Sequence, residues 1–177
     1  TVFETMSRLA AERGAVNLGQ GFPEEDGPRD ILEAAANATL AGPNQYPSMR
    51  GVPELRQAVA VHSRAHHNVD LDWQHEVTIT SGATEAIAAA LLAFIEPGDE
   101  VVVFEPLYDA YVPMVRRAGG VPRIVRLQPP HWRLERETIA AAFSAKTRVV
   151  IINTPLNPNG LLVVDDNDAA DDLPSLL

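Results

Sequence analysis

The chain has 177 residues, of which 46% are hydrophobic and 21% charged, a balance typical of one globular domain with a real core. The formal net charge of −10 argues against nucleic acid or an anionic membrane surface as a partner, although backbone N–H groups could still bind a phosphate locally. There is no cysteine, which excludes a disulfide framework and thiolate chemistry, and no apolar run approaches the length of a membrane span. We therefore expect a cytoplasmic protein.

Residues 1–75 are expected to form a helical and loop segment that precedes a second domain. Helical spacing of apolar residues, with Pro at helix starts and Gly beyond helix ends, predicts helices at 2–13, 28–40 and 52–66. The Gly- and Pro-rich stretch around Gly21 is either a surface turn or backbone that approaches a ligand closely, and the residues leave both readings open. A second loop carries Tyr46 followed by proline, which makes that tyrosine a candidate contact residue.

His62 and His66 lie four residues apart on the third predicted helix, which is the spacing of metal ligands on one helix face. No carboxylate or third histidine completes a ligand set at a recognisable spacing. We therefore interpret both as solvated surface residues and predict no metal site.

From residue 76 the pattern changes to alternating strands and helices. The predicted strands are 76–80, 100–104, 121–127 and 147–153, and the predicted helices are 83–95, about 108–118 and 135–144. The strands are almost continuously apolar, as strands buried on both faces are. The sequence thus predicts an α/β domain at 76–160, with a mostly parallel sheet and flanking helices, followed by an acidic tail at 161–177.

The stretch from Ser81 to Ala86 joins the first predicted strand to the helix after it. Free N–H groups at such a helix start can bind a phosphate. The alternative is a plain N-cap, with Ser81 or Thr84 capping a core helix and Glu85 favourably placed in the first turn. The hexapeptide alone does not decide between these interpretations.

Three loops fall at the carboxyl ends of predicted strands, where ligands bind in sheets of this kind. The first is the stretch 81–84, which can hold an anion. The second contains Tyr108, an aromatic side chain that can stack on a planar ring. The third, residues 153–160, offers amide side chains in a Pro-rich loop. Together they indicate a planar, phosphorylated cofactor.

At this point the sequence resembles the class I/II aminotransferases, enzymes of fold type I that depend on pyridoxal 5′-phosphate. The resemblance covers about residues 1–160 and is strongest to the kynurenine/methionine-type and succinyldiaminopimelate aminotransferase group. The motifs that carry it occur in the family's order: Leu18-Gly19-Gln20-Gly21-Phe22-Pro23, Asn44-Gln45-Tyr46-Pro47, Gly51-Val52-Pro53-Glu54-Leu55-Arg56, Ser81-Gly82-Ala83-Thr84-Glu85-Ala86, Pro97-Gly98-Asp99-Glu100-Val101, Glu105-Pro106-Leu107-Tyr108-Asp109-Ala110-Tyr111 and Asn153-Thr154-Pro155-Leu156-Asn157-Pro158-Asn159-Gly160.

The resemblance implies a role for particular residues. The backbone of Gly82, Ala83 and Thr84 would bind the cofactor phosphate, Tyr108 would stack on the pyridine ring, and Asn157 would hydrogen-bond the ring oxygen O3′. The resemblance further implies that Gly21 lies against the substrate carboxylate and that Tyr46 reaches the phosphate in the other subunit of a homodimer. Amino acids and 2-oxo acids would be the substrates.

The resemblance stops after Gly160, before the family's Schiff-base lysine. The single lysine in the chain, Lys146, precedes the last predicted strand and is expected to be an ordinary surface residue. Asp165, in the acidic tail (Asp165, Asp166, Asp168, Asp171, Asp172), follows a short apolar run but lacks the connecting helix that would make it the family's strand-borne aspartate.

We therefore interpret the chain as the N-terminal portion of an aminotransferase, truncated and inactive alone. A non-catalytic remnant that binds cofactor or dimerises is an alternative, and so is a β-lyase of the same fold. Since neighbouring strands would be missing, we also expect open sheet edges and marginal stability or association.

Overall fold

The computed structural model describes residues 2–19, 21, 25–158 and 160 of the chain. The chain divides into two compact units, Thr1–Met49 and Arg50–Leu177. The predicted domain boundaries after residues 75 and 160 stay predictions. The acidic tail, with Asp165, lies outside the described residues.

The N-terminal unit contains two helices, α1 (Val2–Arg13) and α2 (Arg29–Ala41), where helical spacing predicted them. Neither helix has a buried residue, and large apolar side chains such as Phe3, Ile31 and Leu40 are exposed. Helices in proteins take most of their stability from packing. This unit therefore presents apolar helix faces that need a further surface to pack against.

The second unit is an α/β body built on a three-stranded sheet of order β2-β1-β3, in which both pairs of strands are parallel. A mostly parallel sheet with flanking helices is thus confirmed. In chain order its elements are α3 (Pro53–His67), α4 (Gly82–Phe94), β1 (Glu100–Glu105), α5 (Tyr111–Arg117), β2 (Val121–Arg126), α6 (Arg136–Ala142) and β3 (Thr147–Ile151).

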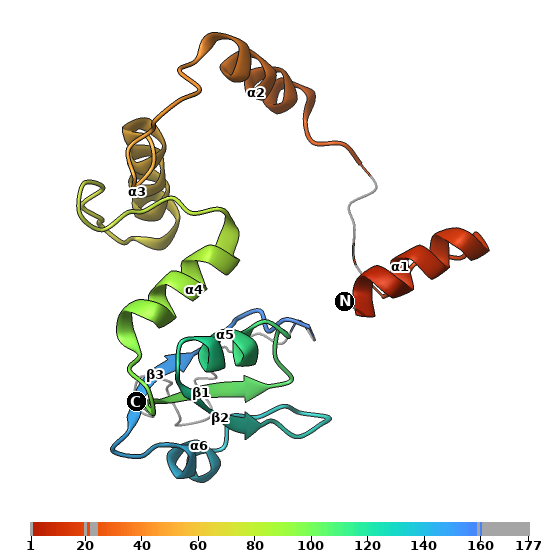
Figure 1. The fold of residues 1–177 in the computed structure, drawn as a ribbon, viewed down its shortest axis with the longest axis vertical. Helices are drawn as coiled ribbons and strands as arrows, with labels where there is room; N and C mark the ends of the chain where they lie inside the picture. The colour runs from red at the N-terminus through yellow and green to blue at the C-terminus, as the bar shows by residue number, and fades with distance from the viewer. Residues whose placement is uncertain (1, 20, 22–24, 159, 161–177) are drawn as a thin grey trace. The chain divides into compact units, whose positions relative to one another are not determined.

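The central strand β1 is buried on both faces, which explains its continuous apolar sequence. Val102 and Phe104 point into one cluster together with Ile139 of α6, while Val101 and Val103 point into another with α4 and α5. Figure 1 shows α5 and α6 on opposite sides of the strands. Because successive side chains of a strand point to opposite faces of the sheet, β1 contributes to both hydrophobic clusters.

The predicted strand at residues 76–80 is wrong, because the structure has no strand there. The Ile79 N–H donates to the Arg50 carbonyl at 2.9 Å, but no ladder of such bonds forms within the described residues. A strand needs a neighbour's row of donors and acceptors, and neither outer edge of the described sheet, at β2 or at β3, pairs with these residues. The β-branched composition therefore predicted a strand for which no ladder forms within the described residues.

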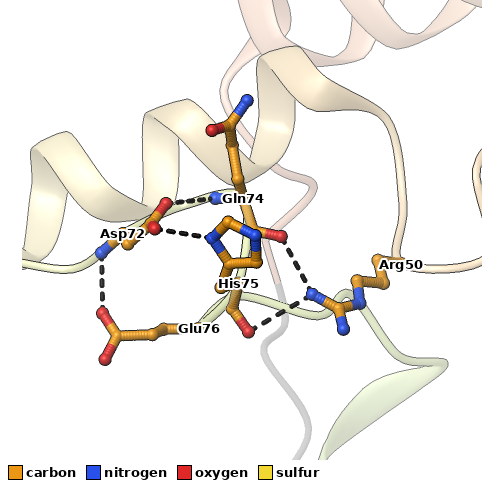
Figure 2. A network of polar contacts seen from close by, with 5 residues as sticks. All are labelled: Arg50, Asp72, Gln74, His75 and Glu76. Carbon is orange, nitrogen blue, oxygen red and sulfur yellow. Dashed lines mark hydrogen bonds and ion pairs between the residues drawn. The ribbon is translucent and has the colours of Figure 1, made fainter.

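A polar network holds the turn between α3 and the segment that leads into α4 (Figure 2). Asp72 accepts from the Gln74 backbone N–H at 2.9 Å, and its other carboxylate oxygen lies 2.7 Å from His75 Nδ1. The Asp72 N–H donates to Glu76 Oε2 at 2.7 Å. Arg50 Nη1 donates to the carbonyls of Gln74 and His75, at 2.9 and 3.3 Å. The hydrogen bond with His75 lowers the pKa of Asp72 below its ordinary value.

Helix α5 begins at Tyr111, later than the predicted start near Tyr108. The Tyr111 N–H donates to the Tyr108 carbonyl at 3.1 Å, which closes a turn ahead of the helix. Pro113 then falls in the first helical turn, where proline costs no hydrogen bond. Tyr108 consequently lies in the loop after β1 and not in the helix.

Candidate functional site

The N-terminal turn of α4 is the first part of the candidate site. Gly82 has φ of +76°, a left-handed conformation that favours glycine, and a Cβ built there would meet no heavy atom within 4 Å. The N-cap residue Ser81 makes no side-chain capping bond. The N–H groups of Ala83 and Thr84 lie in the first turn, where a helix offers no internal carbonyl. They are therefore available to an anion.

An acidic side chain lies at the same helix end. Glu85 accepts a hydrogen bond from the Ser81 backbone N–H, in the manner of a capping box. Its charge suits the helix dipole but repels any anion bound at the neighbouring N–H groups. Glu85 was predicted in the first turn from the sequence, but this hydrogen bond was not, because Ser81 and Glu85 are four residues apart and not at the three-residue spacing of a capping box.

Tyr108 forms the second part, in the loop that follows β1. Its ring meets the ring of Tyr111 edge-on, with centroids 5.6 Å apart and planes at 75°. Tyr111 is buried, so this contact fixes one side of the Tyr108 ring, while Tyr108 itself remains 37% exposed. The arrangement suits a ring that stacks on a ligand.

Asn157 forms the third part, in the loop that follows β3. The Asn157 N–H donates to Asn153 Oδ1 at 2.9 Å, and Asn153 Nδ2 donates to the Pro155 carbonyl at 3.1 Å. Leu156 is only 5% exposed and anchors the loop in the cluster that contains Phe104. The Asn157 side chain is exposed and makes no hydrogen bond to the described residues. The sequence analysis missed the anchoring roles of Asn153 and Leu156.

The loops that carry Tyr108 and Asn157 lie at one end of the sheet. Because β1 and β3 are parallel neighbours, these loops leave the sheet at the same end. Leu91 of α4 and Ile95, its C-cap residue, belong to the cluster on one face of β1. The carboxyl end of α4 therefore packs near the sheet, and Figure 1 shows the helix leading into β1.

Gly21 and Tyr46 belong to the N-terminal unit, so the structure does not test their predicted roles. Tyr46 is 95% exposed and has φ of 48°, which is unusual for a residue other than glycine. Gly21 is exposed. Their contacts with substrate and with a second subunit stay predictions.

The opposite end of the sheet carries a closed polar network around Glu100. Ser144 Oγ donates to Glu100 Oε2 at 2.7 Å, and Arg123 Nε lies 3.1 Å from the same oxygen. The Ser144 hydrogen bond, with Arg123 as a further cause, lowers the pKa of Glu100. Lys146 is exposed at this amino end, next to the start of β3, as the sequence analysis predicted.

No three His, Asp or Glu side chains converge as a metal site within the described residues. Among the described helices, none combines the length and the apolar composition that crossing a bilayer requires.

Comparison with known proteins connects this arrangement to a family. The family described as "Aminotransferase class I and II" matches residues 13–166. The chain is 49% identical over 165 residues to a probable N-succinyldiaminopimelate aminotransferase of Mycobacterium tuberculosis, covering 92% of the chain and 42% of that protein. It is 45% identical over 159 residues to the methionine aminotransferase of Escherichia coli, covering 90% and 41%. The solved structure of the M. tuberculosis enzyme superposes with a TM-score of 0.87, over 92% of the chain and 43% of that structure.

These findings define the structure as part of a fold-type I α/β protein. The chain belongs to the class I and II aminotransferase family, whose members depend on pyridoxal 5′-phosphate. It spans about two fifths of the length of the curated relatives it matches. The predicted resemblance is thereby confirmed.

The described residues fit that cofactor. A phosphate needs several N–H donors, which the first turn of α4 offers beside the open space at Gly82. A pyridine ring needs a stacking partner and a donor or acceptor at its oxygen, which exposed Tyr108 and Asn157 can supply.

Proposed function

We propose that this chain is the cofactor-binding N-terminal portion of a pyridoxal-phosphate-dependent aminotransferase. The proposal depends above all on one observation: Tyr108 and Asn157 follow the adjacent parallel strands β1 and β3 at the same end of the sheet. Membership of the family supports it. The bound cofactor would supply an electron sink for bond breaking at the α-carbon of an amino acid.

Each residue of the proposed site binds or orients. The Gly82 N–H donates to the Thr80 carbonyl at 2.9 Å, so the N–H groups of Ala83 and Thr84 hold the phosphate at the positive end of α4, against the backbone of Gly82. Tyr108 stacks on the ring and keeps water from that face. The Asn157 amide hydrogen-bonds the ring oxygen O3′.

The N-terminal unit contributes the residues that select the substrate and join two copies. Gly21 lies against the substrate carboxylate, and Tyr46 reaches the phosphate of the other copy in a homodimer. The substrates are an amino acid and a 2-oxo acid. The names of the relatives support this class, since they include succinyldiaminopimelate, methionine and kynurenine aminotransferases.

The 177-residue chain alone binds the cofactor without turning over substrate. Transamination by this family needs a lysine that bonds to the cofactor and moves the α-proton. The single lysine of this chain, Lys146, lies at the amino end of β3, away from Tyr108 and Asn157. This position favours a binding role for the chain over a catalytic one.

Equilibrium dialysis with pyridoxine 5′-phosphate tests the proposed site, because this analogue lacks the aldehyde that reacts with any amine. We expect the phosphorylated analogue to bind more tightly than pyridoxine, and Asn157→Ala to weaken binding. Asn37→Ala, which removes an exposed amide on α2, is the matched control and should leave binding unchanged. Equal binding of pyridoxine and its phosphate would contradict the proposed phosphate site.

A turnover assay tests the second half of the proposal. Purified chain, pyridoxal 5′-phosphate, an amino acid and a 2-oxo acid are mixed, and keto-acid product is measured against cofactor alone. We expect no excess of product. Robust turnover would show that a catalytic group was assigned wrongly.

A further inference from the structure

A second group of side chains lies far from these loops in the sequence, on the last turns of α3 (Figure 1). His62, His66 and His67 are all exposed, and their rings lie close together. None of the three rings hydrogen-bonds to a described residue. The proposed function uses none of them.

The distance between the His62 and His66 rings suits two ligands of one metal ion. A metal–nitrogen bond of about 2.0–2.1 Å, with each ring centroid about 1.1 Å beyond its nitrogen, places two centroids about 4.4–5.2 Å apart for bond angles between a right angle and the tetrahedral angle. The centroids of His62 and His66 are 4.4 Å apart, at the short end of that range. The separation of the two rings on α3 is therefore compatible with two ligands of one ion.

His67 does not share this geometry. Its centroid lies 5.9 Å from that of His62, beyond the range for bond angles up to the tetrahedral angle. Five residues along a helix correspond to a rotation of about 140°, so His62 and His67 also leave different faces of α3. Residues four apart lie on the same face. The pair His62 and His66 is thus distinct within a turn that holds three histidines.

The surroundings also favour a cation. The pair lies in the last turns of α3, which ends at His67 with Asn68 as its C-cap residue, so the negative end of the helix dipole is close. Arg64 is the nearest cationic residue between them, and its Nη1 is directed to Asp70 Oδ2, 2.9 Å away. The cation on Arg64 is therefore paired with a carboxylate and lies on another face of the helix.

In contrast to the sequence-based interpretation of both residues as solvated surface side chains, we propose that His62 and His66 form a two-histidine site for a divalent transition-metal ion, with water completing the coordination. Neutral imidazole is a ligand that Cu²⁺, Ni²⁺ and Zn²⁺ accept, and affinity should be highest for Cu²⁺. A metal that bridges the two rings joins successive turns and stabilises the end of α3. This proposal does not depend on the proposed function.

Isothermal titration of the untagged, full-length chain with Cu²⁺, Ni²⁺ and Zn²⁺ tests the site, at a pH about one unit above the imidazole pKa of about 6.5. We expect His62→Ala and His66→Ala each to weaken Cu²⁺ binding at least about tenfold, the lower bound seen when even an outer-shell partner is lost. His67→Ala removes a histidine from the same turn and should leave the affinity unchanged. Mg²⁺, which prefers oxygen ligands, should not bind there.

Thermal unfolding provides an independent readout. Ni²⁺ should raise the melting temperature of the natural chain and of His67→Ala, but not that of the double variant His62→Ala/His66→Ala. All three substitutions are exposed and increase helix propensity, so the variants should fold. Wild-type affinity in the double variant, or an equal loss in His67→Ala, would overturn the proposal.

Discussion

The polar groups at the two ends of the three-stranded sheet differ in their hydrogen bonding. At the amino end, Glu100 accepts a hydrogen bond from Ser144 and pairs with Arg123. At the carboxyl end, the Asn157 side chain is exposed and makes no hydrogen bond to the described residues, while its backbone N–H donates to Asn153 Oδ1 at 2.9 Å. Satisfied groups hold strands in place, whereas groups held in position but unsatisfied can bind a ligand. The hydrogen-bonded groups at the amino end therefore stabilise the fold, whereas the unpaired groups at the carboxyl end are available to a ligand. Substitutions at each end test this difference.

Leu156→Ala should have the largest effect, because this side chain joins the core to the binding loop. Removing a buried leucine typically costs about 2–5 kcal/mol of unfolding free energy. Leu156 is 5% exposed within the cluster around Phe104, and Asn157 follows it directly. Urea unfolding measures the loss, and analogue binding should fall with it. Leu92→Ala, at a position 65% exposed, should change the unfolding free energy by no more than about 0.5 kcal/mol.

Ala83→Pro tests the first turn of α4 through its backbone. Proline fits the first turn of a helix but removes one N–H donor. A hydrogen bond to a charged group is worth about 1.5–3 kcal/mol, so affinity for pyridoxine 5′-phosphate should fall roughly ten- to hundredfold. Thr84→Ala keeps the backbone donor and should bind as the natural chain does. If the two variants lose affinity equally, the phosphate is not held by the backbone.

Glu100→Gln tests the amino end through the pH dependence of stability. The Ser144 hydrogen bond lowers the pKa of Glu100 in the folded chain, so the ionised carboxylate stabilises the fold above the ordinary carboxyl pKa. That contribution is lost as pH falls through the folded-state value. Urea midpoints measured over the acidic range should therefore depend less steeply on pH in the variant. Binding of pyridoxine 5′-phosphate at neutral pH should not change.

Glu85→Gln should have the smallest effect, and in the opposite direction. The glutamine oxygen can still accept from the Ser81 N–H, but the negative charge that repels a phosphate is gone. A charge at a helix terminus is worth about 0.3–1 kcal/mol, which corresponds to about a two- to fivefold gain in affinity. Glu137→Gln, in the first turn of α6, makes the same change at another helix and should leave affinity unchanged. A loss of affinity in Glu85→Gln would show that Glu85 supports the site.

Local pattern predicted most of the second unit. β1 could be predicted because a strand that contributes to two hydrophobic clusters is apolar along its whole length. The loops that carry Tyr108 and Asn157 could then be located from the ends of the predicted strands. Residues 76–80 have the same β-branched character but form no ladder in the described part of the chain. The local sequence does not show whether a pairing strand is present. The Glu85 contact depends on one rotamer at a helix end, which spacing permits but does not require. The predicted roles of Gly21 and Tyr46 come from the resemblance alone, because no local pattern in a single sequence indicates contact with a substrate or with a second subunit.

The order of the strands has a consequence for how the protein folds. Glu100 pairs with Val121 on one side and with Thr147 on the other, so the whole sheet closes among segments that are neighbours along the chain. Each pairing is parallel and spans a helical crossover, so loop entropy is lost before its contacts form and the sheet closes more slowly than a hairpin would. We expect the scaffold that presents Tyr108 and Asn157 to assemble while a longer chain of this family is still being synthesised, ahead of any residue downstream of β3.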